Sequence, residues 1–245
     1  MAPAAAFAGE SPALDCAWRA PPMQTMVQTQ HVHVTSAAGW SRESVRLLRW
    51  KRFDDGTIKA RIGVEAPKRD AGLEVLIVAR PRMRPEIHVY TPDTGRARRM
   101  AGAGASASAL GADVSFEDLQ QIERLLDGLA GQPTRDGMHA GRAVAIIEPD
   151  APNDDASSTR LRAIVDKRWC VPLAVEFFGA DGVLEKTLQT APDRIADVAG
   201  RRVPLETTVT NHQLGTRSTF IVSDIVIDEP LPDHLFTVQD IEQRG

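Results

Sequence analysis

Apolar and polar residues alternate along most of the chain, which is the pattern of half-buried strands. Val32 and Val34, for example, alternate with His31 and His33. Similar strand-like segments follow at residues 44–53, 57–65, 73–79, 85–90, 96–99, 141–148, 159–169, 172–179, 183–190, 201–212 and 216–228. Asp-Gly turns at residues 55–56 and 181–182 join neighbouring segments, as such pairs do in hairpins. The pattern therefore predicts a meandering antiparallel sheet, followed by one turn of helix at residues 230–235.

One stretch changes to the spacing of a helix. Residues 115–118 read Ser-Phe-Glu-Asp, a capping-box-like start that places acidic residues in the first helical turn. The apolar residues that follow at helical intervals are Leu119, Ile122, Leu125, Leu126 and Leu129. Because these positions share one face, the sequence predicts an amphipathic helix over residues 115–129. The Ala, Gly and Ser residues of segment 101–110 can bury little surface, so we expect a surface loop before this helix.

The composition is that of an ordinary globular domain, with 245 residues, 42% hydrophobic and 25% charged. A net charge of -4 does not supply the basic field that nucleic-acid-binding proteins use. The sequence contains no apolar run near the roughly 18 residues of a membrane-spanning helix. A long sheet with one apolar face and one substantial helix can bury that face by closing, or by curling around the helix.

The N-terminus has the features of a trimmed export signal. Residues 1–8 end in Ala6-Phe7-Ala8, the small-x-small pattern of a signal-peptidase site. We interpret residues 1–8 as the tail of a signal peptide, and the alternative is an Ala-rich start to a cytoplasmic protein. Residues 9–28 are expected to form an irregular segment with at most a short helix. Residues 29–245 are expected to form a single domain.

The two cysteines, Cys16 and Cys170, admit two interpretations. An even number of cysteines in an exported protein suggests one disulfide. It would tie the N-terminal segment to the region after Trp169. Alternatively both thiols are free and buried, since cysteine packs as a small hydrophobic residue. The two cysteines provide too few ligands for a metal site.

Other polar clusters do not favour catalysis or metal binding. His31 and His33 point to the same side of a strand, but the sequence offers no third ligand nearby. Asp150, Asp154 and Asp155 lack the spacing of a calcium-binding loop. The sequence also lacks a nucleophile elbow, an H-E-x-x-H motif, a P-loop and a dinucleotide fingerprint. We therefore predict no catalytic residue, no metal and no cofactor.

Arginines are concentrated around one predicted strand pair. They are Arg80, Arg82, Arg84, Arg96, Arg98 and Arg99. They could form a rim for phosphate head groups or for an acidic partner, because guanidinium groups bind phosphate through two hydrogen bonds. Alternatively, they form a solvated strand edge whose charges discourage association between sheets. Both interpretations stay open at this point.

Three motifs, taken in order, resemble those of a known family. They are Tyr90-Thr91-Pro92 with residues 111–119 (G-A-D-V-S-F-E-D-L), residues 165–188 (V-D-K-R-W-C-V-P-L-A-V-E-F-F-G-A-D-G-V-L-E-K-T-L), and residues 228–237 (D-E-P-L-P-D-H-L-F-T). This series resembles the bacterial outer-membrane lipoprotein-sorting family, the LolA-like periplasmic carriers. The resemblance covers residues 30–240, and Ala112 stands where that family usually has Ser.

The resemblance implies a mainly β (α+β) fold, in which a strongly curved antiparallel sheet forms an incomplete β-barrel with helices covering its open side. It also implies a non-enzymatic protein of the Gram-negative periplasm, with a cavity that suits acyl chains. The helix at residues 115–129 would then be a lid that contacts the ligand through Leu119, Ile122, Leu126 and Leu129.

The candidate lining residues are the inward members of alternating strands. They are Leu48, Trp50, Ile62, Val64, Leu76, Val78, Ile87, Val89, Ile146, Ala163, Val175, Phe177, Phe220 and Val222. A slip of one residue within a strand would invert its assignment. Each methylene group that such a cavity removes from water would contribute roughly 0.8 kcal/mol.

Two functional hypotheses from different classes follow. The first is a periplasmic carrier, expected to be a monomer, that binds the acyl chains of a lipoprotein or another lipid for transfer between the inner and outer membranes. Its partners would be an inner-membrane exporter and an outer-membrane acceptor. The alternative is a periplasmic sensor or accessory module that binds a protein partner, such as an exporter or regulator, without transporting lipid.

Overall fold

The computed structural model describes residues 23–81, 83, 85–100, 109–115, 118, 121–122, 134–148 and 160–244. The strands of its main sheet are β1 (Thr25–Thr35), β2 (Ser41–Arg52), β3 (Ile58–Ala66), β4 (Glu74–Ala79), β5 (Glu86–Thr91), β6 (Arg96–Met100), β7 (Thr134–His139), β8 (Arg142–Ile147), β9 (Arg160–Asp166), β10 (Pro172–Phe178), β11 (Leu184–Thr190), β14 (Glu206–Asn211) and β15 (Thr216–Ile227). A separate hairpin consists of β12 (Ile195–Val198) and β13 (Arg201–Pro204). The described helical segments are the 3-10 turns η2 (Ala109–Gly111), η3 (Pro192–Arg194) and η4 (Asp233–Phe236), and the α-helix α3 (Val238–Arg244).

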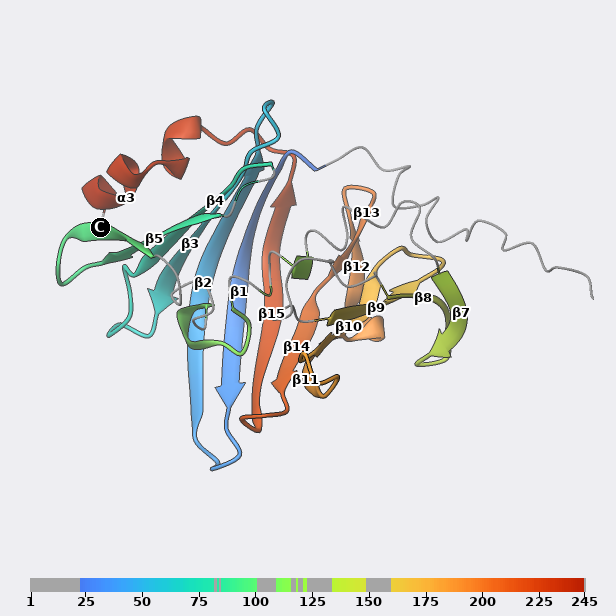
Figure 1. Cartoon of the computed structure of the whole chain (residues 1–245). Helices are drawn as coiled ribbons and strands as arrows, with labels where there is room; N and C mark the ends of the chain where they lie inside the picture. The colour runs from blue at the N-terminus through green and yellow to red at the C-terminus, as the bar shows by residue number, and fades with distance from the viewer. Residues whose placement is uncertain are drawn as a thin grey trace, which may run out of the picture.

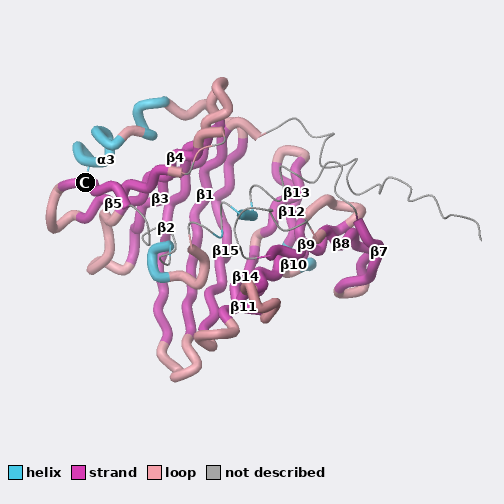
Figure 2. The backbone as a smooth tube through the Cα atoms, viewed as in Figure 1, coloured by secondary structure: helices cyan, strands magenta, loops and turns pink. Residues whose placement is uncertain are grey.

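The main sheet is a single antiparallel sheet of 13 strands in the order β6-β5-β4-β3-β2-β1-β15-β14-β11-β10-β9-β8-β7. Most neighbours in this order are also neighbours in the sequence, as expected for a meander. The sheet is open, because β6 and β7 are its two ends. Figure 1 shows β1, β2 and β15 at the centre, with the two groups of shorter strands curving away on either side. The same curvature is visible in the backbone trace of Figure 2.

The strand register divides the sheet into two faces. We call the inner face the side that carries Val32 and Val34 of β1, and the outer face the side that carries His31 and His33. Cross-strand partners share a face, so the register extends both sides across all 13 strands. On the inner face, Val32 of β1 pairs with two residues, Phe220 of the neighbouring strand β15 and Ser44 of the neighbouring strand β2.

The inner face carries two of the three hydrophobic clusters of the described residues. The first joins Val32, Val75 and Ile87 of the β1–β5 side with Val209 of β14. The second joins Ile147, Ala163, Val175 and Phe177 of β8–β10. Leu188 of β11 packs against both clusters, so the apolar surface is continuous across the curved sheet.

The third cluster lies on the outer face and is covered by the C-terminus. Phe236 and Ile241, from η4 and α3, pack on Leu76, Val78 and Tyr90 and are almost fully buried. Below them, the guanidinium group of Arg61 donates hydrogen bonds to Glu74 and to Asp240 Oδ2 of α3, the latter at 2.5 Å. The C-terminal segment is therefore held to the outer face by both apolar packing and buried ion pairs.

The expectation that helices cover the open side of the sheet is not supported. In the described part of the chain the one α-helix with defined bounds is α3, and it packs on the outer face beside β5 and β6. Asp118, Gln121 and Ile122 have helical conformation within the predicted 115–129 helix. Its remaining inward residues, Leu119, Leu126 and Leu129, lie outside the described residues.

Most predicted strands are present, within a few residues of their predicted ends. The sheet begins at Thr25 rather than Thr29, and the predicted strand at residues 201–212 is divided into β13 and β14. Strand β7, the β12–β13 hairpin as such and helix α3 were missed. None of the helices in the described residues is long and apolar enough to cross a membrane.

Candidate functional site

Most of the predicted lining residues lie together on the inner face. By register these are Leu48, Trp50, Ile62, Val64, Ile87, Val89, Ala163, Val175, Phe177, Phe220 and Val222. They come from strands on both sides of β1. Several of them, including Ile62, Ala163 and Val175, are buried, whereas Leu48, Trp50 and Val89 remain partly exposed.

Leu76, Val78 and Ile146 were assigned to the wrong face. Leu76 and Val78 pack under the C-terminal segment on the outer face, and Ile146 lies opposite Ile164 on that same side. The physical reason is visible in β4, where Val75 is 1% exposed and Leu76 is 2% exposed. A strand that is buried on both sides is apolar on both sides, so its alternation cannot reveal which side faces inward.

A segment of chain crosses the inner face of the sheet. We call residues 109–115 the crossing segment. Its residues Leu110, Ala112 and Val114 pack in the cluster formed by Val32, Val75 and their neighbours. Farther along, Ile122 packs against the second inner cluster. The crossing segment therefore covers part of the apolar inner face in this structure.

Asp113 fixes the middle of the crossing segment to β15. Its carboxylate accepts hydrogen bonds from the hydroxyl groups of Thr216 and Ser218, and its backbone N–H donates to Ser218 Oγ at 2.8 Å. Ser218 is fully buried. The two hydroxyl hydrogen bonds satisfy the Asp113 carboxyl group above the apolar face, and the third bond satisfies its backbone N–H.

The predicted capping box is confirmed at the end of the crossing segment. Ser115 N–H donates to Asp118 Oδ2 at 2.7 Å, and Asp118 N–H donates to Ser115 Oγ at 3.0 Å. Lys186 of β11 adds an ion pair with Asp118 at 2.7 Å. These bonds fix the start of the helix over the β11 side of the inner face.

Arg46 of β2 holds the other end of the crossing segment. Its side chain is 4% exposed, and its Nη2 donates to the carbonyl oxygen of Leu110 at 2.9 Å. Burial, together with the positive charge of Arg42, lowers the pKa of Arg46 from its ordinary value to about 10. Leu110 has a φ of 59°, in the left-handed region that costs a non-glycine residue energy.

A pocket of about 260 Å³ opens between Arg46 and the crossing segment. Its lining residues are Arg42, Ser44, Arg46, Val64, Asp70, Leu73, Leu110 and Gly111. Glycine is favoured at position 111, because its φ of +80° strains other residues and a Cβ atom would also crowd Arg42 Nη1 at 3.1 Å. The Arg42 guanidinium group forms an ion pair with Asp70 at 2.8 Å at the border of the pocket.

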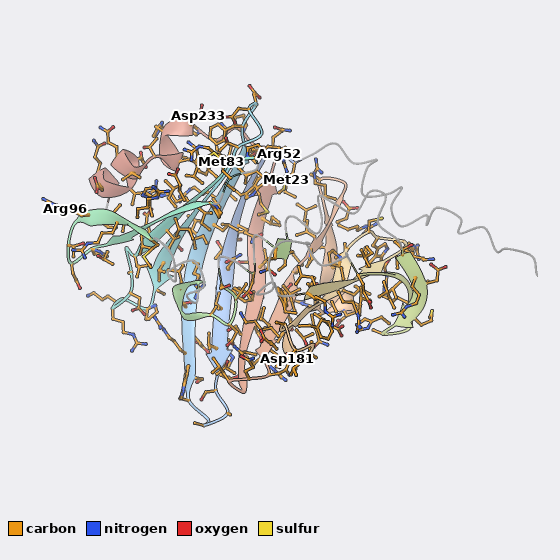
Figure 3. The ribbon with its side chains drawn as sticks, viewed as in Figure 1. Met23, Arg52, Met83, Arg96, Asp181 and Asp233 are labelled. Carbon is orange, nitrogen blue, oxygen red and sulfur yellow. The ribbon has the colours of Figure 1, made fainter. Side chains whose placement is uncertain are left out.

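A second pocket, of about 370 Å³, lies where β2 ends near Asp228–Asp233. Much of its charged lining is paired internally. Lys51 forms an ion pair with Asp233 at 2.7 Å, and Asp228 accepts a hydrogen bond from Gln24 N–H. Figure 3 labels Arg52 and Asp233 at this end of the molecule. Because none of its lining residues belongs to the inner apolar clusters, we assign no ligand to it.

The D-K-R-W-C-V-P motif forms a tight turn after β9. Asp166 is 1% exposed, and its Oδ1 accepts hydrogen bonds from the N–H groups of Arg168 and Trp169. Burial raises its pKa, but these bonds and the Arg142 guanidinium group outweigh that effect, so the pKa lies below its usual value. Cys170 is disulfide-bonded, whereas Cys16 lies outside the described residues, so the Cys16–Cys170 pairing stays a prediction.

The sequence reasoning missed Arg46, Asp113 and Lys186. The sequence pattern did indicate an inward position for Arg46, because Ser44, Arg46 and Leu48 alternate along β2 and share one face. Asp113 gave no such signal, because its partners on β15 are more than 100 residues away in the sequence.

The open curved sheet resembles the fold of LolA-like proteins, and comparisons with solved structures show this likeness at the level of the fold. One similar structure is a domain from Vibrio parahaemolyticus described as an outer membrane lipoprotein-sorting protein. It has 20% identity and a TM-score of 0.81, over 96% of this chain and 99% of that one. A DUF1329 family protein from Desulfovibrio piger has the same identity and TM-score, over 95% and 100% of the two chains.

A LolA superfamily protein from Nitrosomonas europaea is also similar, with 14% identity and a TM-score of 0.64, over 89% of this chain and 91% of that one. None of these three proteins is described as an enzyme. A family model described as "Uncharacterized protein" matches residues 56–243, most of the chain, so the chain belongs to that family. A comparison with curated proteins finds no match.

Proposed function

We propose that the protein is a periplasmic carrier that binds the acyl chains of a lipoprotein or another lipid on its inner face. The observation that supports this most strongly is the continuous apolar surface from β5 to β8, on which two clusters meet at Leu188. The similar fold of a protein described as lipoprotein-sorting points in the same direction. Binding would be driven by removing methylene groups from water, at roughly 0.8 kcal/mol each.

Ligand entry requires the crossing segment to move. The pocket beside Arg46 has a volume of about 260 Å³, which is below the range of about 300–1,000 Å³ that is usual for small-molecule sites. An acyl chain therefore needs the space that Leu110, Ala112 and Val114 now fill. The hydrogen bond between Arg46 and Leu110 and the strained backbone of Leu110 make this end of the segment the easier one to release.

Native mass spectrometry of the protein, purified from a periplasmic preparation, tests the proposal. We expect a stoichiometric acylated ligand, which extraction would then identify by class. An unliganded mass, with no uptake of added phospholipid or lipopeptide, would contradict the carrier function. That outcome would support the accessory module that binds a protein partner.

A further inference from the structure

Arginine provides the ionisable side chains on the inner face of β1–β6. By register they are Arg42, Arg46, Arg52, Arg96 and Arg98. The acidic residues Glu43, Glu74 and Glu86 of the same strands lie on the outer face. Glu65 stands apart from both faces, in the exposed bulge of β3. The inner face of these strands therefore combines an apolar surface with side chains whose charges are all positive.

Two of these arginines, Arg96 and Arg98, stand on the edge strand β6 and are exposed, and Glu242 of α3 accepts a hydrogen bond from the N–H of Ala97 between them. Arg42 forms an ion pair with Asp70, and Arg46 is buried against Leu110. Arg96 and Arg98 of β6, in contrast, form no ion pair with any described residue. Figure 3 labels Arg96 at this outer margin of the sheet. Their charges are thus available to a ligand.

Their neighbours place this charge beside the apolar surface. Arg98 lies opposite Val89 of β5, and Met100 lies opposite Ile87. Val89 and Ile87 belong to the first inner cluster, where Val89 remains partly exposed. Residues two apart on a strand project to the same side at a spacing of about 7 Å, so two long arginine side chains can converge on one phosphate group.

Arg99 of the same strand provides an internal comparison. Its side chain belongs to the outer face, where it lies 3.9 Å from Glu86. If the arginines of β6 served only to keep this edge strand from pairing with other sheets, all three residues would be equivalent. If the inner face binds a ligand head group, only Arg96 and Arg98 contribute.

We propose that Arg96 and Arg98 bind the phosphate of an anionic amphiphile whose acyl chains lie on the inner face. This inference rests on the proposed carrier function and adds the chemical class of its ligand. An acidic lipid would place its chains on the apolar strands β3–β5 and its head group at the edge strand β6. The shared chemistry is a phosphate ester, and the attached acyl chains distinguish a lipid from a free phosphate compound.

Calorimetric titration with short-chain lipids below their micelle concentration tests the proposal. The probes are phosphatidylglycerol and phosphatidylcholine with identical acyl chains, and glycerol phosphate without chains. Wild-type protein is expected to bind phosphatidylglycerol about tenfold more tightly than phosphatidylcholine, since hydrogen bonds to charged groups are the stronger ones. The preference should shrink as added salt screens the exposed charges.

The double variant Arg96→Gln with Arg98→Gln is expected to bind both lipids equally, at the phosphatidylcholine affinity of the wild type. The matched variant Arg99→Gln should keep the wild-type preference. Equal binding of both lipids by wild-type protein would overturn the head-group assignment and leave the carrier function standing. The head-group assignment would also be overturned if the double variant still preferred phosphatidylglycerol, or if glycerol phosphate bound as tightly as phosphatidylglycerol. Failure of both lipids to bind would instead contradict the carrier function itself.

Discussion

Two buried arginines, one on each face of the sheet, have pKa values that are shifted in opposite directions. Arg61 on the outer face is 3% exposed and Arg46 on the inner face is 4% exposed. Burial lowers the pKa of Arg61, but Glu74 and Asp240 outweigh burial and raise it overall. For Arg46, burial and the charge of Arg42 act together, and its pKa falls to about 10.

This difference in pKa shift indicates that Arg61 has a structural role, whereas Arg46 belongs to a candidate functional site. The charge of Arg61 stabilises the fold, because it joins α3 to the sheet. The charge of Arg46 opposes folding, and that penalty is fully present below about pH 10 and disappears as the pH rises through the ordinary pKa of arginine. Perturbed basic groups of this kind are concentrated at functional sites, and Arg46 lies on the face where we place the ligand.

The same substitution at both arginines tests this comparison and carries the largest expected effect. Arg61→Met should lower the free energy of unfolding by about 3–5 kcal/mol, because it leaves the buried Asp240 and the partly buried Glu74 without their partner. Arg46→Met should change it by only about 1 kcal/mol, because the lost hydrogen bond is offset by the removal of a buried charge. Urea unfolding measures both values. Equal losses for the two variants would show that the two arginines have the same role.

A substitution at Trp50 tests whether the inner face binds lipid. It lies on the inner face opposite Met26 and Ala60 and is only partly buried. Trp50→Asp should weaken lipid binding about a hundredfold while the protein stays folded, because a carboxylate would face the acyl chains. Titration with a fluorescent fatty-acyl lipid measures the loss.

The control is Ile221→Asp, since Ile221 is 37% exposed on the outer face. It should bind lipid as the wild type does. Unchanged binding by a folded Trp50→Asp variant would remove Trp50 from the site.

Asp113 tests whether the crossing segment is anchored at β15. Asp113→Asn should lower the free energy of unfolding by about 2 kcal/mol, because charge-assisted hydrogen bonds to Thr216 and Ser218 are lost. Amide hydrogen exchange should become faster in residues 109–115 and stay unchanged in α3. Faster exchange spread evenly over the molecule would argue against a local anchor.

The smallest expected effect concerns the Arg42–Asp70 pair at the pocket. Burial raises the pKa of Asp70, but Arg42 and Arg69 outweigh it and hold the pKa below 3.8. A carboxyl group whose pKa is lowered by folding stabilises the fold when the pH is above its ordinary pKa. This contribution is lost as the pH falls through the folded-state pKa. Asp70→Asn should therefore be less stable than wild type by at most about 1 kcal/mol near neutral pH. The difference should vanish below the folded pKa, and a gap that widens in acid would contradict the assignment.

Local sequence signals predicted the sheet well, because each strand and turn is encoded by its own residues. The capping box at Ser115 and Asp118 was predictable for the same reason, since its two members are three residues apart. Strand β7 (T-R-D-G-M-H) was not, because it is mostly polar and, among the described strands, pairs with β8 alone. Helix α3 was missed because only Val238 and Ile241 are apolar, and their burial depends on the distant Leu76 cluster.

The candidate site was predictable only in part. Strands such as β10, with Val175 and Phe177 inward and the polar Glu176 between them, show their inner side by alternation. Strand β4 is buried on both sides, so Leu76 and Val78 could not be assigned from the sequence. The roles of Arg46 and Asp113 depend on contacts between distant segments, which no local pattern encodes.

Photo-crosslinking from the acyl chain tests the central claim most directly, namely that lipid occupies the inner face. A phospholipid with a photoreactive group at the end of one chain would be bound, irradiated and mapped to single residues by mass spectrometry. We predict crosslinks to inner-face residues such as Trp50, Val89 and Phe220, and none to the outer-face residues Leu47 and Ile221. Crosslinks at the outer-face residues, or a protein that takes up no lipid at all, would contradict the account.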